Sequence, residues 1–299
     1  MSAPWLRAFV GLVRRYLPGA TLVVGGYYYA TNSREFLSLD ADVFCVGEGE
    51  ERLPRLVRAI LAGEPLGGIP GLYLRGADGD LVHTGTVEPL DLSRLPGLDW
   101  RLSSRIDPAV DVDTEEVEYG IETQRGCVFK CEFCTYRTLS SPNQLPPAEA
   151  AERILATRLG PRGFINMTDA TATFPHARWE ELMTRLVERG GSPYPIWAYA
   201  RVSDLAEKTV ELMARAGVRQ VFIGQESGDQ RILDAMRKGT RLSQVRPALA
   251  ALSRHGVSAV FGLIHGFPGE TPESLQATRD LIDNVFEYTR QGRKLMVYS

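Results

Sequence analysis

The pattern of apolar and polar residues at the start of the chain predicts helices that alternate with short buried strands. Apolar residues recur at the spacing of one helix face over residues 4–17. Two apolar runs, 21–24 and 43–46, predict strands that lead into glycine turns, and a second amphipathic helix carries apolar residues over 53–61. This order is typical of a doubly wound α/β sheet, although two strands and two helices are too few to cover both faces of one.

A second section, from about residue 63 to 118, is rich in glycine and proline. Two short apolar segments, 72–74 and 81–82, flank the turn Asp78-Gly79 and predict a β-hairpin. We expect this section to be a connector with little core of its own.

From residue 119 onward the pattern alternates regularly between strands and helices. Six strands separated by helices indicate a partial (β/α)6 parallel barrel, in which active sites form at the carboxyl ends of the strands. The predicted organisation is α/β throughout: an incomplete doubly wound segment at 1–68, a linker with a hairpin at 69–118, and the partial barrel at 119–299. The barrel strands are predicted at residues 119–123, 163–167, 196–200, 220–224, 259–264 and 294–298.

Composition narrows the class of protein. The chain has 299 residues, of which 44% are hydrophobic and 24% charged, as in ordinary globular domains. Its formal net charge of −3 gives no support for nucleic-acid binding. It has no apolar run of the roughly 18 residues that cross a bilayer and no signal peptide at its start, so we expect no membrane contact. Three of the four cysteines are clustered, which fits a reducing cytoplasm better than a disulfide framework.

Cys127, Cys131 and Cys134 carry the strongest chemical signal, because the spacing C-x3-C-x2-C places three thiols on one short loop. Three thiolates can bind three irons of a cubane iron–sulfur cluster and leave the fourth iron open to another ligand. A zinc site is the alternative, but structural zinc is closed by four ligands and no histidine lies near this loop. The remaining Cys45 lies in an apolar run, where a buried and inert thiol is expected.

The cysteine spacing, with the aromatic Phe133 before its last cysteine, resembles the radical SAM superfamily. Three later segments resemble the same family in order: 224–228 (G-x-E-S-G), 236–239 (M-N-K-G, with Arg237 in place of asparagine) and 262–271 (G-x-I-x-G-x-P-G-E-T). The resemblance implies a [4Fe–4S] cluster on the three cysteines and S-adenosylmethionine (SAM) at the open iron. The cluster would pass an electron to SAM and cleave it to methionine and a 5′-deoxyadenosyl radical.

The resemblance also implies which residues contact SAM. Phe133 is expected to pack on the adenine or to shield the cluster from water. Arg201 and Glu226 are candidates for contacts to the ribose or carboxylate of SAM, with a salt bridge or helix cap as the structural alternative. Backbone of the fifth barrel strand is expected to lie against the adenine at Gly262, Ile264 and Gly266. Further polar residues at the same strand ends are Asn166, Asp169 and Gln225, and no catalytic side chain is assigned.

Two glycine turns in the first segment resemble those of cobalamin-binding domains. Residues 23–31 resemble the turn G-G-x-h-x-T, and residues 42–50 resemble D-x-x-x-x-G-E-G-E; plain α/β loop geometry is the alternative. In such domains these turns lie against the nucleotide tail of cobalamin. The opening strands of such a domain would precede Met1, so we interpret 1–68 as its C-terminal part and expect this chain alone to bind cobalamin weakly. The resemblance assigns tail contacts to Gly25, Gly26, Gly47 and Gly49.

Together these resemblances predict a cobalamin-dependent radical SAM enzyme, most consistent with a C-methyltransferase or a related radical reaction on a small molecule or natural product. The implied partners are that substrate and a reductant of the flavodoxin or ferredoxin type. Cobalamin-independent radical SAM chemistry, such as cyclisation, rearrangement or oxidation, is an alternative, and so is a non-catalytic metal-binding protein. A methylthiotransferase is disfavoured, because its N-terminal domain needs a cysteine triad and Cys45 stands alone.

Overall fold

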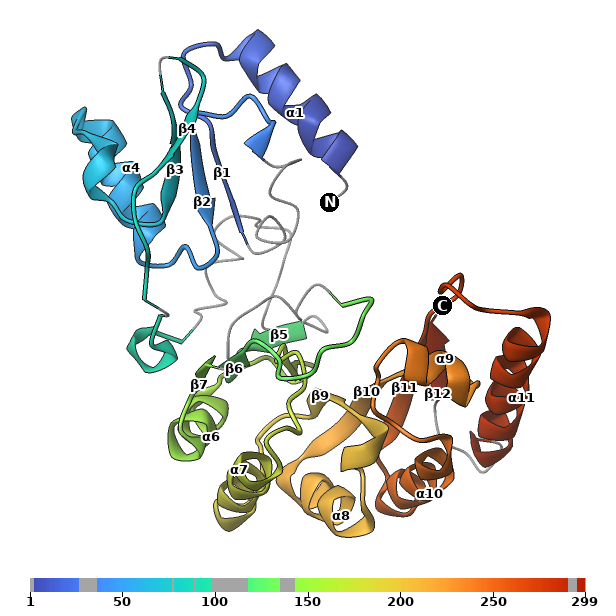
Figure 1. The fold of residues 1–299 in the computed structure, drawn as a ribbon. Helices are drawn as coiled ribbons and strands as arrows, with labels where there is room; N and C mark the ends of the chain where they lie inside the picture. Colours follow the sequence, from blue (N-terminus) through green and yellow to red (C-terminus); the bar gives the residue numbers. More distant parts are fainter. Residues whose placement is uncertain are drawn as a thin grey trace. The chain divides into compact units, whose positions relative to one another are not determined.

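The computed structural model divides the chain into two compact units, Met1–Leu90 and Asp91–Ser299 (Figure 1). Each unit has a sheet and a hydrophobic core of its own. Residues 27–31 of the first predicted glycine turn lie outside the described residues, whereas its Gly25 and Gly26 lie within them. The structure describes residues 3–26, 37–76, 78–88, 90–97, 118–134, 143–289 and 295–298.

The first unit is a four-stranded sheet with a helix on each face (Figure 1). In order across the sheet its strands are β1 (Val23–Gly26), β2 (Val43–Val46), β3 (Leu72–Arg75) and β4 (Leu81–His83), and its helices are α1 (Ala3–Tyr16) and α4 (Arg52–Ala62). β1 and β2 are parallel, whereas β2, β3 and β4 pair antiparallel. Successive residues of a strand point to opposite faces. Phe44 therefore packs with Val10 of α1, and Cys45 packs with Leu56 of α4.

The hairpin of β3 and β4 belongs to the first unit and not to a connector, which corrects the sequence prediction. The hairpin itself and its Asp78-Gly79 turn were predicted, and Gly79 has the positive φ of 87° that such a turn favours. The sequence did not show that β3 pairs with β2, which leaves Leu72 0% exposed. Leu92 is buried in the core of the second unit. The boundary thus lies after Leu90, and the predicted linker 69–118 contributes to both cores.

The second unit is a sheet of six parallel strands in the order β12-β11-β10-β9-β8-β5. Neighbouring strands of this sheet follow one another in the sequence. Helices lie between them along the chain, which confirms the predicted alternation of strands and helices. The strands are β5 (Glu118–Ile121), β8 (Phe164–Met167), β9 (Ile196–Ala200), β10 (Val218–Glu226), β11 (Ser258–Leu263) and β12 (Leu295–Tyr298). The helices are α6 (Pro147–Ala156), α7 (His176–Glu188), α8 (Glu207–Ala216), α9 (Gln230–Ala235), α10 (Val245–His255) and α11 (Pro272–Thr289).

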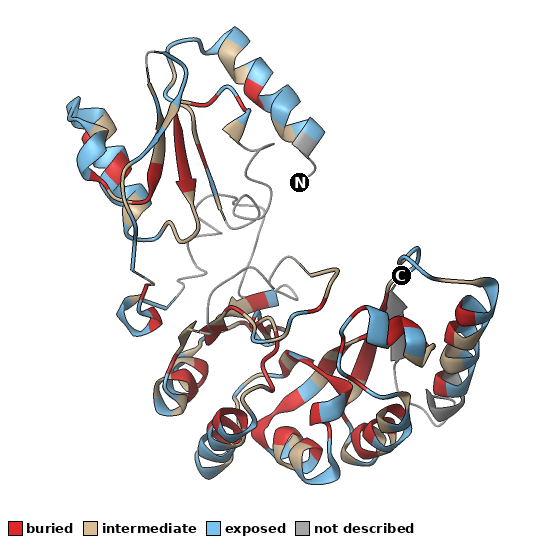
Figure 2. Cartoon of the chain, in the orientation of Figure 1, coloured by how far each residue is buried: buried red, intermediate tan, exposed pale blue. Residues whose placement is uncertain are grey.

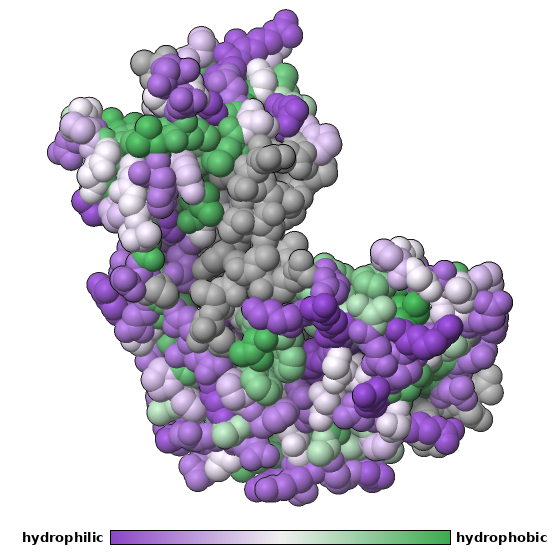
Figure 3. Space-filling model, in the orientation of Figure 1, coloured by the Kyte–Doolittle hydropathy of each residue, from purple (hydrophilic) through white to green (hydrophobic). Residues whose placement is uncertain are grey.

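The helices are amphipathic, with a buried side toward the sheet and an exposed outer side (Figure 2). Hydrophilic residues cover most of the described surface in Figure 3, with smaller hydrophobic patches. None of the helices that the structure describes combines the length and the apolar character needed to cross a membrane. Large apolar side chains exposed on the first unit include Trp5, Phe9 and Leu12 of α1 and Leu53, Val57 and Leu61 of α4.

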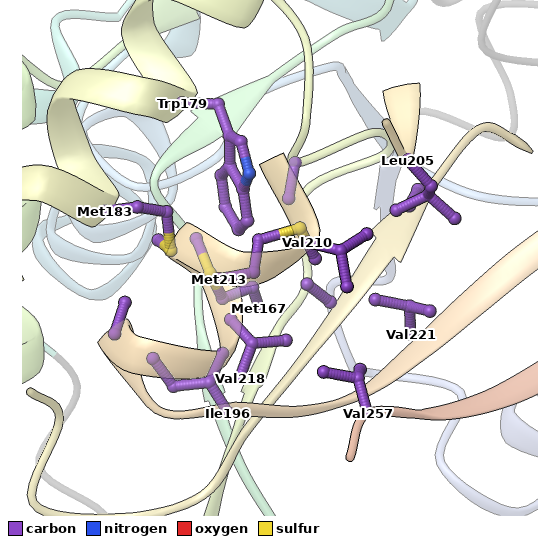
Figure 4. Packing of buried hydrophobic residues seen from close by; sticks show 14 of the residues in the cluster. Met167, Trp179, Met183, Ile196, Leu205, Val210, Met213, Val218, Val221 and Val257 are labelled. Atoms are coloured by element: carbon purple, nitrogen blue, oxygen red, sulfur yellow. The ribbon is translucent and has the colours of Figure 1, made fainter. Parts of the chain in front are cut away.

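The main core lies between the six-stranded sheet and its helices. Helix α7 contributes four 0% exposed side chains at the spacing of one helix face: Trp179, Leu182, Met183 and Leu186. Figure 4 shows Trp179 and Met183 packed near Met213 of α8 and Met167 of β8. Full burial of such a side chain stabilises the fold by roughly 1.5–3 kcal/mol. The sheet is therefore well packed, and the loops at the carboxyl ends of its strands start from fixed positions.

Candidate functional site

Several residues that the sequence singled out in the second unit lie at the carboxyl ends of its parallel strands. In a parallel α/β barrel these ends lie along one edge, where active sites form. The cysteine loop follows β5, Arg201 follows β9, and Glu226 ends β10. Ile264 lies directly after β11, and its N–H donates to the backbone oxygen of Glu226 (2.9 Å). This bond connects the ends of β10 and β11.

Cys127, Cys131 and Cys134 lie on one tight loop. Cys131 is 6% exposed, and the other two are half-buried. The N–H of Cys134 donates to the oxygen of Cys131 (3.1 Å), and Gly126 begins the loop with a positive φ of 81°. Burial raises the pKa of the Cys127 thiol, and the thiols of Cys134 and Cys131 raise it further. Cys131 and Cys134 therefore lie near enough to Cys127 to act on it electrostatically, although the three thiols do not converge as a set of metal ligands in the structure.

The loop offers a set of three thiols. Within the part of the chain that the structure describes, no three Cys, His, Asp or Glu side chains converge as ligands of a single metal ion. Cys45, the remaining cysteine, is 4% exposed in a hydrophobic core of the first unit, as the sequence predicted. None of the three loop cysteines belongs to that core.

Arg201 lies against the cysteine loop. Its guanidinium carbon is 3.8 Å from the centre of the Phe129 ring, and its Nη2 donates to the backbone oxygen of Lys238. The residue is 6% exposed. Phe129 in turn packs edge-on against Phe174, with 5.1 Å between the ring centres. Arg201 therefore joins the loop to the segment around Lys238, and its contact with SAM stays a prediction.

Glu226 forms a buried ion pair with Lys238. Oε1 of Glu226 and Nζ of Lys238 are 2.7 Å apart, and the two side chains are 10% and 9% exposed. Nζ also lies 5.6 Å from the centre of the Phe133 ring, on the cysteine loop. Gly224 makes room for this pair, because a Cβ added there would overlap Oε1 and come within 2.8 Å of Nζ. The salt bridge given as the alternative role of Glu226 is present, and its contact with SAM stays a prediction.

The segment 236–239 packs on the cysteine loop. The N–H of Glu132 donates to the oxygen of Met236 (2.9 Å), and Arg237 Nε lies 3.1 Å from Glu132 Oε1. Arg237 has a positive φ of 50°, a conformation that asparagine adopts more readily than most residues. The asparagine of the family motif at this position therefore suits this backbone. Sequence reasoning missed Lys238 as a site residue, although it had singled out the motif that contains it.

The glycines of the fifth strand meet two different needs. Gly262 lies inside β11, where an added Cβ would come within 2.7 Å of the Phe222 ring, so packing excludes a side chain. Gly266 has a positive φ of 82° and open space where its Cβ would be. Glu270 Oε2 holds this turn by accepting hydrogen bonds from the N–H groups of Gly266 and Phe267. The backbone at Gly266 has room for a ligand, and the adenine contacts of this strand stay predictions.

Three other polar residues at strand ends have different surroundings. Asn166 Nδ2 donates to Glu118 Oε1 (2.5 Å) in an exposed pair. Gln225 is 0% exposed; its Nε2 donates to the oxygen of Ser227 (3.0 Å), and its Oε1 has no partner among the described residues. Asp169 is 0% exposed and accepts three hydrogen bonds from residues that precede the cysteine loop. Burial raises the pKa of Asp169 to about 6.

In the first unit the glycine turns end the parallel strands β1 and β2. A Cβ added to Gly25 would come within 2.6 Å of the backbone oxygen of Cys45, so the two strands exclude a side chain there. Gly26 and Gly47 have positive φ values of 113° and 86°. Gly49 has room for a side chain. The first three glycines are therefore required by the backbone, and the cobalamin contact of all four stays a prediction.

Arg52 of α4 holds the second glycine turn, residues 46–49, through hydrogen bonds to backbone oxygens. Its Nη2 donates to the oxygen of Val46 (2.9 Å) and to the oxygen of Glu48, and its Nη1 donates to the oxygen of Gly71 (2.8 Å). Glu48 Oε2 accepts from the N–H of Leu90 (2.8 Å). This turn therefore has a defined shape that a bound molecule does not need to order.

The sequence model of the radical SAM superfamily matches residues 121–282, which is more than half of the chain. The chain belongs to the radical SAM superfamily. This family uses a [4Fe–4S] cluster and SAM, and its enzymes act on a substrate with the help of a reductant. The matched residues contain the cysteine loop, Arg201 and the Glu226–Lys238 pair.

Several curated proteins are similar to this chain. An uncharacterized methyltransferase of Pyrococcus horikoshii is 30% identical over 257 residues, which cover 82% of the chain and 53% of the relative. An anaerobic magnesium-protoporphyrin IX monomethyl ester cyclase of Synechocystis sp. is 25% identical, over 82% of the chain and 50% of the relative. A tryptophan 2-C-methyltransferase of Streptomyces laurentii is 28% identical, over 56% of the chain and 30% of the relative. The chain spans about half the length of the first two.

Solved structures share the fold across both units. The radical SAM methyltransferase TsrM from Kitasatospora setae, with cobalamin and a [4Fe–4S] cluster bound, matches with a TM-score of 0.73 at 20% identity, over 95% of this chain and 58% of that chain. The cobalamin-dependent SAM radical enzyme OxsB matches with a TM-score of 0.71 at 19% identity, over 97% of this chain and 46% of that chain. The predicted fold class, a partial radical SAM barrel after a cobalamin-binding-like segment, is confirmed.

Proposed function

We propose that this chain is the radical SAM part of a cobalamin-dependent enzyme that methylates carbon in a small molecule or natural product. The observation that carries the proposal is the packing of the three-cysteine loop against Arg201 and the buried Glu226–Lys238 pair. The reaction class is supported by relatives named as methyltransferases. The glycine turns of the first unit support cobalamin as the second cofactor, through their sequence resemblance.

The loop supplies the ligand types and the sequence spacing that a [4Fe–4S] cluster takes. Three thiols over residues 127–134 provide the soft ligands that iron–sulfur clusters take, and they leave one iron for SAM. We assign the ligands as Cys127, Cys131 and Cys134. The rings of Phe129 and Phe133 on the same loop limit the access of water. When bound, the cluster and SAM together supply the one-electron cleavage that starts radical chemistry.

The chain's own residues bind, orient and exclude water around these groups. Arg201 lowers the pKa of the Cys127 thiol and so opposes the effect of burial, and the thiolate is the form that binds iron. The open space at Gly266 suits the adenine, because no side chain stands between a ligand and the backbone there. Glu226 offers carboxylate oxygens as hydrogen-bond acceptors for the ribose hydroxyls of SAM, and Lys238 keeps that carboxylate in place.

In the first unit, we assign the tail of cobalamin to the turns at Gly25-Gly26 and Gly47–Gly49. The positive φ values of Gly26 and Gly47 turn the chain without side chains at the strand ends.

We further propose a flavodoxin or ferredoxin as the reductant and the cytoplasm as the location, because the cysteines are free thiols and suit a reducing compartment. Radical ring closure is a second candidate reaction, favoured by the similarity to the magnesium-protoporphyrin cyclase.

Anaerobic reconstitution of the protein and its cysteine variants tests the proposal. Cys127→Ala, Cys131→Ala and Cys134→Ala should each lose the cluster and the cleavage of SAM to 5′-deoxyadenosine under dithionite. Cys45→Ala is the matched control and should lose neither. The measurements are iron and sulfide per chain and the yield of 5′-deoxyadenosine. Zinc in place of iron, or a cluster that survives in two of the three loop variants, would contradict the assignment.

A further inference from the structure

A short two-stranded ladder closes the two ends of the segment 126–142, which contains the cysteine loop and of which residues 135–142 lie outside the described residues. β6 (Gln124–Arg125) and β7 (Asn143–Gln144) pair antiparallel. One residue outside this ladder, the N–H of Leu145 donates to the oxygen of Thr123 (2.9 Å). The residues on either side of this segment therefore lie side by side.

A buried carboxylate holds the first end of the loop. Asp169 lies just beyond β8 and is 0% exposed. Its Oδ1 accepts from the N–H of Thr123 (2.7 Å) and of Gln124 (3.0 Å), and its Oδ2 accepts from Thr123 Oγ1 (2.5 Å). Hydrogen bonds to an ionised carboxylate are roughly twice as strong as neutral ones. Asp169 thus fixes the backbone a few residues before Cys127.

A buried arginine holds both ends. Arg178 of α7 donates from Nη2 to the oxygen of Thr123 (2.9 Å) and to its Oγ1 (3.0 Å), and from Nε to the oxygen of Leu145 (3.1 Å). The residue is 9% exposed. Burial lowers the pKa of Arg178, and the charge of Asp169 opposes this. The rigid fork of a guanidinium suits this task, because it presents several donors in a fixed geometry.

We propose that Asp169 and Arg178 are positioning residues that hold both ends of the cysteine loop and so set the placement of its three thiols for a cluster. The proposal rests on the proposed function. Burying two charges is a cost that apolar side chains of the same size would avoid. Helix α7 already supplies four fully buried apolar side chains to the core, so the charge of its Arg178 is better explained by a need for one fixed loop geometry than by stability.

The protonation state of Asp169 gives this role a second signature. Protonation on Oδ2 leaves Oδ1 free to accept from both N–H groups and turns the contact with Thr123 Oγ1 into a bond that the acid donates, but it removes the negative charge that makes these bonds strong. Burial is the main cause that raises its pKa to about 6, opposed by the hydrogen bonds from Thr123 and Gln124 and by the charge of Arg178. Thr123 and Gln124 do not titrate, and Arg178 stays charged at neutral and acidic pH. The ends of the loop should therefore loosen as the pH falls through about 6.

Hydrogen exchange of the metal-free protein tests the geometry directly. Asp169→Asn keeps the shape of the side chain but replaces an acceptor by a donor. Peptides that contain residues 122–125 and 143–146 should then exchange at least about tenfold faster, because a bond to a charged group has been lost. In the wild type, the exchange rate of the same peptides divided by their intrinsic rate should be higher at pH 5.5 than at pH 7.5. This dependence on pH should be absent in Asp169→Asn.

Cluster retention tests the consequence. After anaerobic reconstitution, Asp169→Asn should lose iron to a chelator about 10–100-fold more readily than the wild type, as when the groups that support metal ligands are removed. Arg178→Gln should act in the same direction. The electron paramagnetic resonance spectrum of the reduced cluster should broaden in both variants, because the thiols take more than one arrangement.

Asp204→Asn is the matched control. Asp204 is also buried, 4% exposed, but it accepts from Thr173 Oγ1 (2.6 Å) and Ser203 Oγ (2.8 Å) instead of the loop ends. It should leave exchange and cluster retention unchanged. If Asp169→Asn does not fold, Thr123→Val removes only the hydroxyl bonds and should show a smaller loss in the same direction, which Thr123→Ser restores.

The outcomes separate this proposal from the proposed function. Wild-type exchange and retention in folded Asp169→Asn, or an equal loss in Asp204→Asn, would overturn the positioning role. A wild type that takes up no cluster would contradict the proposed function, and exchange of the metal-free protein would still decide whether Asp169 holds the loop ends.

Discussion

Lys238 and Glu226 form an ion pair with 2.7 Å between Nζ and Oε1, and each side chain is about nine-tenths buried. Glu226 reaches Lys238 from an unusual backbone, with a positive φ of 66° and a shift in strand register between Gly224 and Glu226. Such irregularities cluster at functional sites, and a non-glycine residue in this conformation costs on the order of 1–3 kcal/mol. The pair therefore sits where the strand stops being regular and the site begins.

Lys238→Met should destabilise the metal-free protein by about 3–5 kcal/mol, because the carboxylate of Glu226 is left buried without its counter-charge. The double variant Lys238→Met, Glu226→Gln removes both charges and should recover much of the loss. Urea unfolding of the three proteins at pH 7.5 measures the difference. Equal instability of the single and double variants would show that the unpaired charge is not the cause.

Gly266→Leu should weaken SAM binding to the reconstituted protein, because the new side chain would fill the open space at the end of β11. Gly269→Leu is a matched control on the same turn, since Gly269 also has a positive φ, 93°, and open space around it. Both variants place a side chain on a glycine with positive φ, so the backbone strain is of the same kind in both. A difference in SAM affinity between them therefore reports whether the added side chain occupies the SAM site. Equilibrium dialysis with SAM should show at least about a tenfold larger loss, or 1.4 kcal/mol, for Gly266→Leu. Equal affinities would remove the adenine contact from this turn.

Gly25→Ala should destabilise the first unit by about 1–3 kcal/mol, because its Cβ would come within 2.6 Å of a backbone oxygen that neither strand can move without losing its pairing. Gly11→Ala should act in the opposite direction. Gly11 lies inside helix α1 with open space around it, and alanine there is favoured by about 0.5–1 kcal/mol. Thermal unfolding followed by circular dichroism compares the two. A Gly25→Ala protein as stable as the wild type would mean that β1 and β2 lie further apart.

Asp169 should make stability fall as the pH rises from about 4 to about 6. Its pKa is raised from near 3.9 in the unfolded chain to about 6 in the folded one, so the folded state binds more protons in this window. The free energy of unfolding should drop by about 3 kcal/mol across it, and this slope should be absent in Asp169→Asn. Urea unfolding of both proteins between pH 4.5 and 7.5 measures it, and a constant difference between them would contradict the assignment. Protonation of Asp169 thus stabilises the folded protein as a whole against unfolding, while the ionised carboxylate binds the loop ends more strongly.

The strands could be predicted from the sequence because each is a local run of apolar residues. Their ends were less predictable where tertiary contacts decide them. The strand predicted at 119–123 ends at Ile121, because Thr123 leaves the ladder to bind Asp169 and Arg178. The short helix α9, Gln230–Ala235, was missed because six residues are too few to show a period.

The cysteine loop could be recognised because its three ligands are close together in the sequence. The contacts that hold it could not, since they join distant positions. Thr123 and Asp169 are 46 residues apart, and no local pattern pairs them. Lys238 carried one usable signal, a lysine within a recognised motif, but its pairing with Glu226 follows from the bend at the end of β10.

The strands of the six-stranded sheet lie in the same order as they occur in the sequence. During synthesis the N-terminal part of a chain emerges first, so each new strand finds its neighbour already made. The cysteine loop leaves the ribosome with β5, at the start of this series, and Asp169, Arg201 and Lys238 follow one after another. Its supports are complete only when Lys238 has emerged. We therefore expect the thiols to be most open to oxygen and stray metals in the growing chain, before the finished protein exists.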